Sequence, residues 1–320
     1  MEENTEQRVD LTLFSEKIQE LKDRIASVIV GQEQTVDLVL TAILANGHVL
    51  IEGVPGVAKT LLARLTARLI DADFSRVQFT PDLMPSDVLG TTVFNMKTNG
   101  FDFHQGPIFA DIVLVDEINR APAKTQAALF EVMEERQISI DGTTHRMGDL
   151  YTILATQNPV EQEGTYKLPE AQLDRFLMKI TMDYPSLEEE VNILERHHTN
   201  AALVKLDDIV PAITKEELLS LRAFMNQVFV DRTLLQYIAL IVQQTRTSKA
   251  VYLGASPRAS VAMLQSSKAY ALLQGRDFVT PEDIKFVAPY VLQHRLILTA
   301  EAEMEGYSPV KVTQRLIDKV

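Results

Sequence analysis

The chain has 320 residues, of which 46% are hydrophobic and none is cysteine, and its formal net charge is −13 from 31 basic and 44 acidic side chains. The absence of cysteine excludes disulfides, thiolate metal sites and cysteine nucleophiles, and the acidic balance argues against a protein that coats duplex nucleic acid. No apolar run reaches the roughly 20 residues of a membrane span. The first residues are polar and acidic, whereas a signal peptide begins basic and turns apolar, so we expect a cytoplasmic protein.

Two helices are predicted ahead of the first strand. Apolar side chains recur at helical spacing over residues 10–30 and again over residues 36–44, and residues 29–32 interrupt the pattern between them. The apolar run at residues 48–52 follows as a short strand. Another short strand is predicted at residues 74–79, where apolar and polar side chains alternate.

The sequence Gly-Val-Pro-Gly-Val-Ala-Lys-Thr at residues 53–60 lies between the first strand and a helical pattern, as a phosphate-binding loop does. Glycines let the backbone approach an anion, and the N–H groups and dipole of the new helix attract it. Lys59 would reach the β- and γ-phosphates and Thr60 would bind Mg²⁺. The general pattern has glycine where this chain has Ala58, and we expect Ala58 to be in helical geometry, where a methyl group is tolerated. An ordinary strand-to-helix turn is the alternative.

The segment 81–107 carries strand signals where a simple connection is expected. Residues 92–96 and 101–103 alternate in polarity on either side of an Asn-Gly pair at residues 99–100, which is a strong signal for a tight hairpin turn. We therefore predict a β-hairpin inserted into a strand–helix unit. A second hairpin is predicted at residues 137–146, around an Asp-Gly pair.

Two acidic residues follow the next predicted strand. Residues 112–115 form an apolar run of the buried, parallel-sheet type, and Asp116 and Glu117 come directly after it. Open α/β sheets bind ligands at the carboxyl ends of their strands. Asp116 could hold Mg²⁺, directly or through water, and Glu117 could orient and deprotonate an attacking water. The pattern alone leaves open an ordinary pair of acids at a strand end.

An amide and two arginines complete the candidate set. The strand predicted at residues 151–155 is followed by Asn158, whose amide could contact a γ-phosphate or the attacking water, although an Asn-Pro turn would have the same sequence. Arg175 and Arg258 are candidates because guanidinium donors match phosphoryl oxygens. A surface ion pair with Asp174 is the alternative for Arg175. Arg258 lies in the first turn of a predicted helix, where a cation is unfavourable unless an anion is near.

Strands alternate with helices up to about residue 183 and helical patterns follow, which predicts an α/β fold with a mostly parallel sheet covered on both faces. The α/β domain is expected over residues 1–199, with the insert at about 81–107 and a linker helix at about 187–199. An all-α lid domain is expected over residues 200–320.

Two other chemistries find no support. The chain has no Gly-x-Ser-x-Gly motif, so a hydrolase nucleophile elbow is excluded. Its six histidines show no spacing typical of metal ligands, and we expect His197 and His198 to lie on a solvated helix face.

Together these motifs resemble the MoxR family of AAA+ ATPases, in the helix-2-insert branch that also holds the magnesium-chelatase ATPase subunits. The resemblance covers nearly the whole chain and implies a P-loop NTPase core with a lid. Alanine is usual in this family at the position of Ala58. The matching segments are Gly-Val-Pro-Gly-Val-Ala-Lys-Thr at 53–60, Val-Gln-Phe-Thr-Pro-Asp-Leu-Met-Pro-Ser-Asp at 77–87, Gly-Pro-Ile-Phe-Ala at 106–110, Asp-Glu-Ile-Asn-Arg-Ala-Pro at 116–122, Ala-Thr-Gln-Asn-Pro-Val-Glu-Gln-Glu-Gly-Thr-Tyr at 155–166 and Leu-Pro-Glu-Ala-Gln-Leu-Asp-Arg-Phe at 168–176.

The resemblance implies an ATPase that uses ATP and Mg²⁺. Lys59 and Thr60 would belong to Walker A, Asp116 and Glu117 to Walker B, with Thr60 and Asp116 near the metal ion, and Asn158 would be sensor 1. The turn at residues 30–32 would line the adenine pocket. The nucleotide-contacting residues implied are Val30, Gly31, Gln32, Gly53, Val54, Pro55, Gly56, Val57, Ala58, Lys59, Thr60, Leu61 and Asp116.

Arg175 resembles the arginine finger that one subunit offers to its neighbour, and Arg258 resembles sensor 2 of the lid. Gln78 is a weaker candidate for restraining Glu117, and Arg120 is a candidate for a subunit interface. A finger that acts in trans requires an oligomer, and the resemblance implies a homo-oligomeric ring, expected to be a hexamer.

The resemblance also implies a chaperone-like remodeller or activator of partner proteins, with a separate von Willebrand factor A domain protein as a candidate partner. The hairpin around residues 94–103 is a candidate contact with substrate or pore, and packing on the neighbouring subunit is the alternative. Three other functions stay open. They are a nucleotide-gated adaptor with slow hydrolysis, a chelatase-type metal-insertion subunit, and a nucleic-acid motor, which the acidic charge disfavours.

Overall fold

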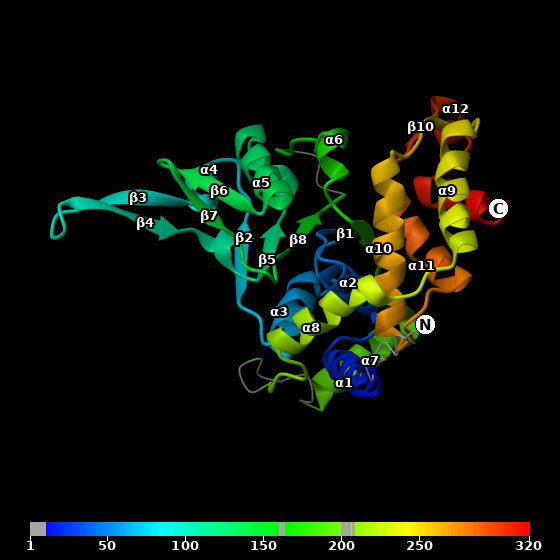
Figure 1. The fold of residues 1–320 in the computed structure, drawn as a ribbon, viewed down its shortest axis with the longest axis horizontal. Coiled ribbons are helices and arrows are strands. Elements are labelled where there is room, and N and C mark those ends of the chain that lie inside the picture. Colours follow the sequence, from blue (N-terminus) through cyan, green and yellow to red (C-terminus); the bar gives the residue numbers. More distant parts are fainter. Residues whose placement is uncertain (1–10, 160–163, 200–205, 207–208) are drawn as a thin grey trace, which may run out of the picture.

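The computed structural model describes residues 11–159, 164–199, 206 and 209–320. Part of the motif at residues 155–166 and the start of the predicted lid at residue 200 lie outside the described residues. An α/β body lies beside a helical lid, and a long hairpin projects from the body on the side away from the lid (Figure 1). No helix among the described residues combines the length and apolar character needed to cross a membrane.

Five parallel strands form the sheet at the centre of the body, in the order β2-β5-β8-β1-β9, and the parallel pairing was predicted. The strands are β1 (Val49–Gly53), β2 (Phe74–Gln78), β5 (Ile112–Asp116), β8 (Thr152–Gln157) and β9 (Met178–Met182). Strand β9 was not predicted, although its apolar residues alternate with Lys179 and Thr181 as they do in a half-buried strand. Its buried residues alternate with these two, as in an edge strand that faces the core on one side.

Alternate residues of the central strands face opposite sides of the sheet, and each side has its own hydrophobic cluster. On β5, Ile112 and Leu114 belong to a cluster with helices α1 (Thr12–Val28), α2 (Glu33–Leu44) and α3 (Lys59–Leu69), whereas Val113 and Val115 belong to a cluster with helix α5 (Ala123–Glu135). Both faces are therefore buried, which explains why the strand is an unbroken apolar run. The sheet is covered on both faces, as predicted.

The helices follow the predicted spacing closely. The two N-terminal helices are interrupted at residues 29–32, and a helix fills the predicted linker position. The bounds are α1 (Thr12–Val28), α2 (Glu33–Leu44), α3 (Lys59–Leu69), α4 (Pro85–Leu89), α5 (Ala123–Glu135), α6 (Glu170–Leu173), α7 (Leu187–His198), α8 (Lys215–Phe224), α9 (Arg232–Thr247), α10 (Pro257–Leu273), α11 (Pro281–Leu292), α12 (Ala300–Met304) and α13 (Pro309–Ile317).

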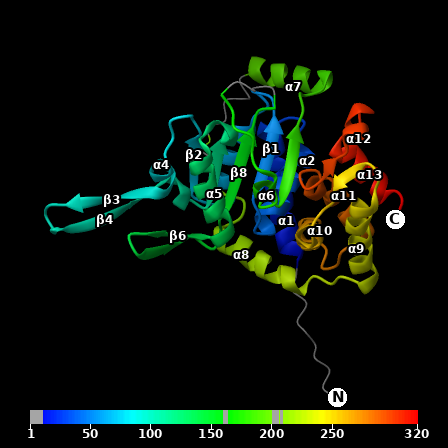
Figure 2. The same cartoon turned by 90° about the horizontal axis from the view of Figure 1, so that it is seen from above.

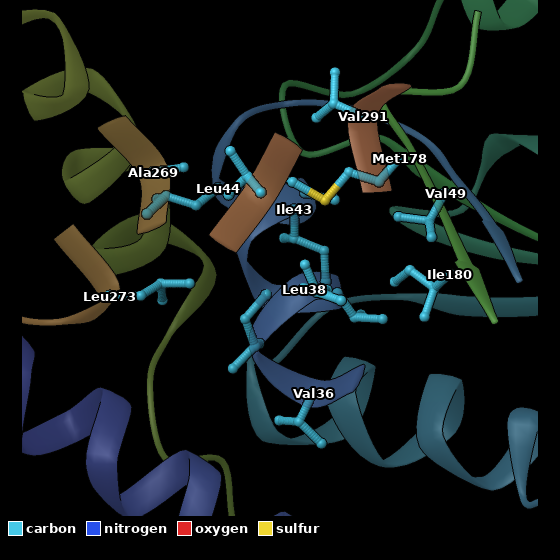
Figure 3. Packing of buried hydrophobic residues seen from close by; sticks show 14 of the residues in the cluster. Val36, Leu38, Ile43, Leu44, Val49, Met178, Ile180, Ala269, Leu273 and Val291 are labelled. Carbon is cyan, nitrogen blue, oxygen red and sulfur yellow. The ribbon is translucent and has the colours of Figure 1, made fainter. Parts of the chain in front are cut away.

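Helix α2 lies between the sheet and the lid. Figure 3 shows Leu38 and Ile43 of α2 between Val49 of the sheet on one side and Ala269 and Leu273 of α10 on the other. These side chains belong to one continuous buried cluster. The lid is thus packed onto the body through apolar contacts as well as through the polar contacts described below.

The lid differs in two details from the all-helical domain expected from residue 200. Strands β10 (Val251–Leu253) and β11 (Ile297–Leu298) pair antiparallel within it. Helix α8 also binds the body, because Arg222 donates to the carbonyl oxygens of Ile43 and Asp149 and Lys215 forms an ion pair with Asp111. We therefore propose that the lid proper begins with α9.

Two hairpins interrupt the body, as predicted. Strands β3 (Gly90–Asn95) and β4 (Gly100–Gln105) form the projecting hairpin, and β6 (Gln137–Ile140) and β7 (Thr143–Arg146) form the second (Figure 2). A side chain at Gly90 would place its Cβ 2.3 Å from the carbonyl oxygen of His104, so only glycine fits at the base of the projecting hairpin.

His48 joins β1 to β8 and α5 inside the body. Its Nδ1 accepts a hydrogen bond of 3.0 Å from the Ile153 amide, and its Nε2 donates to the Met133 carbonyl oxygen at 3.1 Å. Burial, reinforced by the charge of Arg136, lowers the pKa of His48 to about 3. The ring is therefore neutral in the folded protein, whereas in the unfolded chain it gains a proton below its ordinary pKa of about 6.5.

This difference predicts a loss of stability in mild acid. Between pH 7.5 and pH 5 the unfolded state binds a proton at residue 48 that the folded state does not, so His48 alone should lower the free energy of unfolding by about 2 kcal/mol. Urea unfolding of His48→Gln at the two pH values should show a pH-dependent loss smaller by that amount. Gln243→Ala, at an exposed position of α9 without a titratable group, should keep the wild-type dependence. An unchanged dependence in His48→Gln would contradict this account.

Candidate active site

The predicted phosphate loop connects the end of β1 to the start of α3. Lys59 is the first residue of α3, and its Nζ donates to the carbonyl oxygens of Gly53 at 2.5 Å and Val54 at 3.2 Å. Gly56 has φ of 92°, in the left-handed region that favours glycine. The loop therefore curls around the ammonium group of Lys59, ahead of the free N–H groups of the helix.

Ala58 does not have the helical geometry that the sequence analysis expected. It precedes α3 with φ of 63° and ψ of 22°, which is left-handed. A side chain in this conformation costs roughly 1–2 kcal/mol relative to right-handed helical geometry. The expectation was wrong because it placed Ala58 inside the helix, whereas the helix begins one residue later.

The structure brings nine predicted residues together around one cavity. A cavity of about 390 Å³ is lined by the loop and by residues from the ends of β5 and β8. The predicted residues that line it are Pro55, Gly56, Ala58, Lys59, Thr60, Leu61, Asp116, Glu117 and Asn158. They come from three neighbouring strands of a parallel sheet, whose carboxyl ends meet at one edge.

A second cavity, of about 250 Å³, adjoins the first and shares Gly56, Ala58 and Leu61 with it. Val30 and Gln32 line this cavity, as the predicted adenine-pocket turn would. Gly31 is not among the residues that line it, and a Cβ at this position would lie 2.3 Å from Glu189 Cδ.

Helix α7 forms a wall of the second cavity that the sequence analysis did not predict. Ile193, Arg196 and His197 line the cavity, and Arg196 donates to the Ser27 carbonyl oxygen at 2.7 Å, which ties α7 to α1. His197 is exposed, as expected, yet it borders the cavity. Only the packing of α7 on α1, 169 residues away in sequence, reveals this wall.

Asp116 is held by two residues that were not predicted as site residues. The hydroxyl group of Thr156 donates to Asp116 Oδ1 at 2.5 Å, and the guanidinium group of Arg76 donates to Oδ2 at 2.7 Å. Thr156 also accepts a hydrogen bond of 3.0 Å from the Glu117 amide. One buried hydroxyl group therefore fixes both acidic residues. Arg76 pairs with Leu114 and Gln78 with Asp116, so alternation along β2 and β5 could have placed Arg76 and Asp116 on the same face of the sheet.

Glu117 is held by Arg120 and not by Gln78. Its Oε2 lies 2.9 Å from Arg120 Nε, whereas the side-chain oxygen of Gln78 accepts from Arg76 at 2.8 Å. Glu117 also has a left-handed backbone, with φ of 56°. Strained backbone of this kind is concentrated at functional sites, where the surrounding structure enforces it.

Neither predicted arginine lines the two cavities of its own chain. Arg175 forms an ion pair with Glu134 of α5, at 2.6 Å between Nη2 and Oε2, so the alternative pairing with Asp174 is wrong. Asp174 pairs instead with Arg295 of the lid, at 2.6 Å. Arg258, on α10, lies 3.6 Å from the other oxygen of Glu134. The structure thus gathers both arginines at one carboxylate outside the cavities.

Comparison with known proteins places the chain among ATPases. Residues 48–178 match the family described as "ATPase family associated with various cellular activities (AAA)", and residues 243–318 match an AAA lid domain. The chain is 47% identical to YeaC of Bacillus subtilis over 93% of this chain and 92% of that protein. It is 44% identical to Chaperone MoxR1 of Mycobacterium tuberculosis, over 92% of this chain and 80% of that protein.

A more distant relative and a crystal structure agree with this assignment. Protein MoxR of Methylorubrum extorquens is 30% identical over 92% of this chain and 91% of that protein. A crystal structure of a candidate ATPase from Cytophaga hutchinsonii is similar with a TM-score of 0.89 at 41% identity, covering 97% of this chain and 96% of that one.

The hydroxyl group of Thr156 provides a direct test of the site geometry. In Thr156→Val the hydroxyl is lost but the shape is kept, so Asp116 Oδ1 and the Glu117 amide lose a buried partner. We expect the free energy of unfolding to fall by about 1–3 kcal/mol and ATP hydrolysis to fall with it. Urea unfolding and a steady-state ATPase assay would measure both. Thr156→Ser keeps the hydroxyl and should lose less than about 1 kcal/mol; equal losses in the two variants would contradict the bridging role.

Proposed function

The chain belongs to the MoxR family of AAA+ ATPases, and from this premise we propose that it hydrolyses Mg-ATP as a homo-oligomeric ring that remodels or activates partner proteins. The observation that carries the proposal is the meeting of Lys59, Glu117 and Asn158 at one cavity beside a second cavity of about 250 Å³. The first cavity suits the triphosphate and the second suits the adenine base.

The loop supplies the groups that bind phosphate. Lys59 now donates to two carbonyl oxygens of the loop, so its ammonium group is already directed to the place where β- and γ-phosphates would lie. Lys59, Thr60 and Leu61 at the start of α3 line the same cavity, and the free N–H groups of this first turn carry the positive end of the helix dipole. Binding therefore exchanges loop carbonyls for phosphate oxygens without moving the helix.

The donor set of the cavity also fits Mg²⁺. Thr60 supplies a hydroxyl oxygen and Asp116 a carboxylate, and Mg²⁺ prefers one or two such oxygens together with phosphate oxygens and water. When bound, the ion would neutralise charge on the β- and γ-phosphates. Arg76 and Thr156 keep the Asp116 carboxylate in place for this role.

Glu117 is the residue that we assign to the attacking water. It lines the cavity, and its carboxylate can accept the proton of a water molecule that attacks the γ-phosphorus. Asn158 is buried at the same edge, where its amide can orient the water or the γ-phosphate. The ion pair of Glu117 with Arg120 must open or turn before Glu117 reaches the water, so Arg120 is placed to control the base.

Among the described residues no arginine lines the phosphate cavity, so we propose that a neighbouring subunit supplies one for the transition state. Arg175 lies outside both cavities of its own chain, on Glu134, which agrees with a finger offered in trans. We propose that subunits form a ring, with six subunits, in which Arg175 of one completes the cavity of the next. Arg258 would turn from Glu134 toward the phosphates when the lid closes.

The projecting hairpin is our candidate contact with the partner protein. Met96 and Phe101 near its end are 88% and 73% exposed, and Phe101 contacts the exposed ring of Phe94, so apolar side chains gather in one place as they do at interaction sites. The relative MoxR1 is named a chaperone, and a chaperone-like role for this chain fits such a surface. A separate protein with a von Willebrand factor A domain is the partner class that we propose.

One substitution tests the proposed action of Arg175 in trans. Arg175→Ala should leave the Kd for ATP within a few-fold but lower kcat by about 10³-fold or more, because only the transition state uses the finger. Arg315→Ala, at an exposed arginine of α13, is the matched control and should hydrolyse normally. Full turnover by Arg175→Ala at concentrations where the protein is monomeric would contradict action in trans.

Glu117→Gln tests the base and the partner together. This variant should bind ATP and hydrolyse it at least about 10²-fold more slowly, because the amide cannot accept the proton. A pull-down from native extract with Glu117→Gln and ATP should enrich a partner that Lys59→Ala, which lacks the phosphate-binding cation, does not. Near-normal hydrolysis by Glu117→Gln would assign the base to another residue.

A further inference from the structure

The lid is hydrogen-bonded to the chain segment that carries Arg175. Three consecutive residues that follow α11 donate hydrogen bonds to backbone carbonyl oxygens of residues 174–179. They are Gln293, His294 and Arg295. We propose that Arg295 is a positioning residue, which couples the orientation of the lid to the position of Arg175 and so to hydrolysis in the neighbouring subunit. This inference rests on the proposed action of Arg175 in trans.

Arg295 makes most of the contacts. Its side chain is 5% exposed, and its Nε donates to Asp174 Oδ1 at 2.6 Å. Nη2 donates to the carbonyl oxygens of Asp174 at 3.2 Å and Phe176 at 2.8 Å, and Nη1 donates to that of Leu177 at 3.1 Å. A guanidinium group holds its donors in one rigid plane, so these bonds fix the backbone on both sides of Arg175.

The two residues before Arg295 extend these hydrogen bonds toward β9. His294 Nε2 lies 2.9 Å from the Phe176 carbonyl oxygen, and the Gln293 amide donates to the Lys179 carbonyl oxygen. Burial, followed by the charge of Arg295, holds the pKa of His294 well below its usual value, so the ring is neutral. The contact therefore adds no second positive charge beside Arg295.

A second contact joins the lid to the guanidinium group of Arg175 itself. Glu134 binds Arg175 through Oε2 at 2.6 Å, while Arg258 of the lid helix α10 lies 3.6 Å from Oε1 of the same carboxylate. The lid thus reaches both the backbone beneath Arg175 and the group that holds its side chain. A turn of the lid that draws Arg258 toward a nucleotide would act on both, and would release Arg175 toward the neighbour.

A purely structural role for Arg295 makes a different prediction. If the ion pair only held the lid on the body, its loss would harm every function of the subunit, including its own nucleotide site. If it positions Arg175, only the site of the neighbouring subunit would suffer. Experiments with mixed subunits separate these two roles, because the defective and the intact parts can then be placed on different chains.

The test uses Arg295→Lys, which keeps the charge opposite Asp174 but loses the fork of donors. We expect its kcat to fall at least tenfold while KM and Kd for ATP stay within twofold. Arg276→Lys is the matched control, because Arg276 forms a partly buried pair with Asp283 that lies wholly within the lid. The control should keep kcat within twofold of the wild-type value.

ATP hydrolysis by mixtures of two variant subunits is a measurement that a mere change in stability would not alter in the predicted way. Glu117→Gln subunits cannot hydrolyse ATP but carry an intact Arg175, so in equal mixtures they should restore turnover at the intact cavities of Arg295→Lys. Random assembly predicts about a quarter of the wild-type rate per subunit. An equal mixture of Arg175→Ala with Glu117→Gln should recover to the same level.

The mixtures also separate failure of this inference from failure of the proposed function. If ATP hydrolysis recovers in the mixture that contains Arg175→Ala but not in the mixture that contains Arg295→Lys, the positioning role of Arg295 is overturned. The proposed action of Arg175 in trans is then unaffected. Recovery with neither would contradict the trans finger and the coupling together. Should Arg295→Lys fail to fold, Asp174→Asn, which removes the carboxylate but keeps an acceptor oxygen, takes its place with the same expectations. An unchanged kcat in both variants would overturn the inference.

Discussion

Parallel pairing of β5, β8 and β1 is the constraint on which the rest of this molecule depends. The register places Val49 opposite Leu154 and Leu114 opposite Leu154, so the three strands end at one edge of the sheet. Only this alignment brings a loop near residue 56, the acids at 116 and 117 and the amide at 158 to one cavity. Burial of both sheet faces enforces the register, because a slip by one residue would exchange the two hydrophobic clusters.

The two acidic residues at this sheet edge are firmly held, whereas the side chains of the two candidate arginines are not. Asp116 and the Glu117 amide share the buried hydroxyl of Thr156, so their geometry is set before any ligand arrives. Arg175 and Arg258 instead meet at Glu134, a partly exposed carboxylate that both can leave. Acidic residues in fixed positions and arginine side chains that can move are what we expect of a site that is complete only when the lid and a neighbouring subunit contact it.

The sequence predicts the parts of this site that follow from local pattern. A strand, a glycine-rich turn and Lys-Thr are contiguous, and an apolar run followed by Asp-Glu reads as a buried strand end, so the chemistry of residues 53–60 and 116–117 is visible without a structure. What it misses depends on tertiary contacts. The pairing of Arg175 with Glu134, 41 residues away, and of Asp174 with Arg295, 121 residues away, has no local signature. The left-handed backbone of Ala58 was missed because helix ends are the least certain feature of a sequence pattern.

The central claim is that each hydrolytic site is completed by Arg175 of the next subunit. A structure of the Glu117→Gln assembly with bound ATP and Mg²⁺ tests it most directly. The account predicts that the Arg175 guanidinium group has left Glu134 and lies within hydrogen-bond distance, about 2.7–3.2 Å, of a γ-phosphate oxygen in the adjacent subunit. An Arg175 that remains on Glu134 in the closed assembly, or that contacts the nucleotide of its own chain, would contradict it.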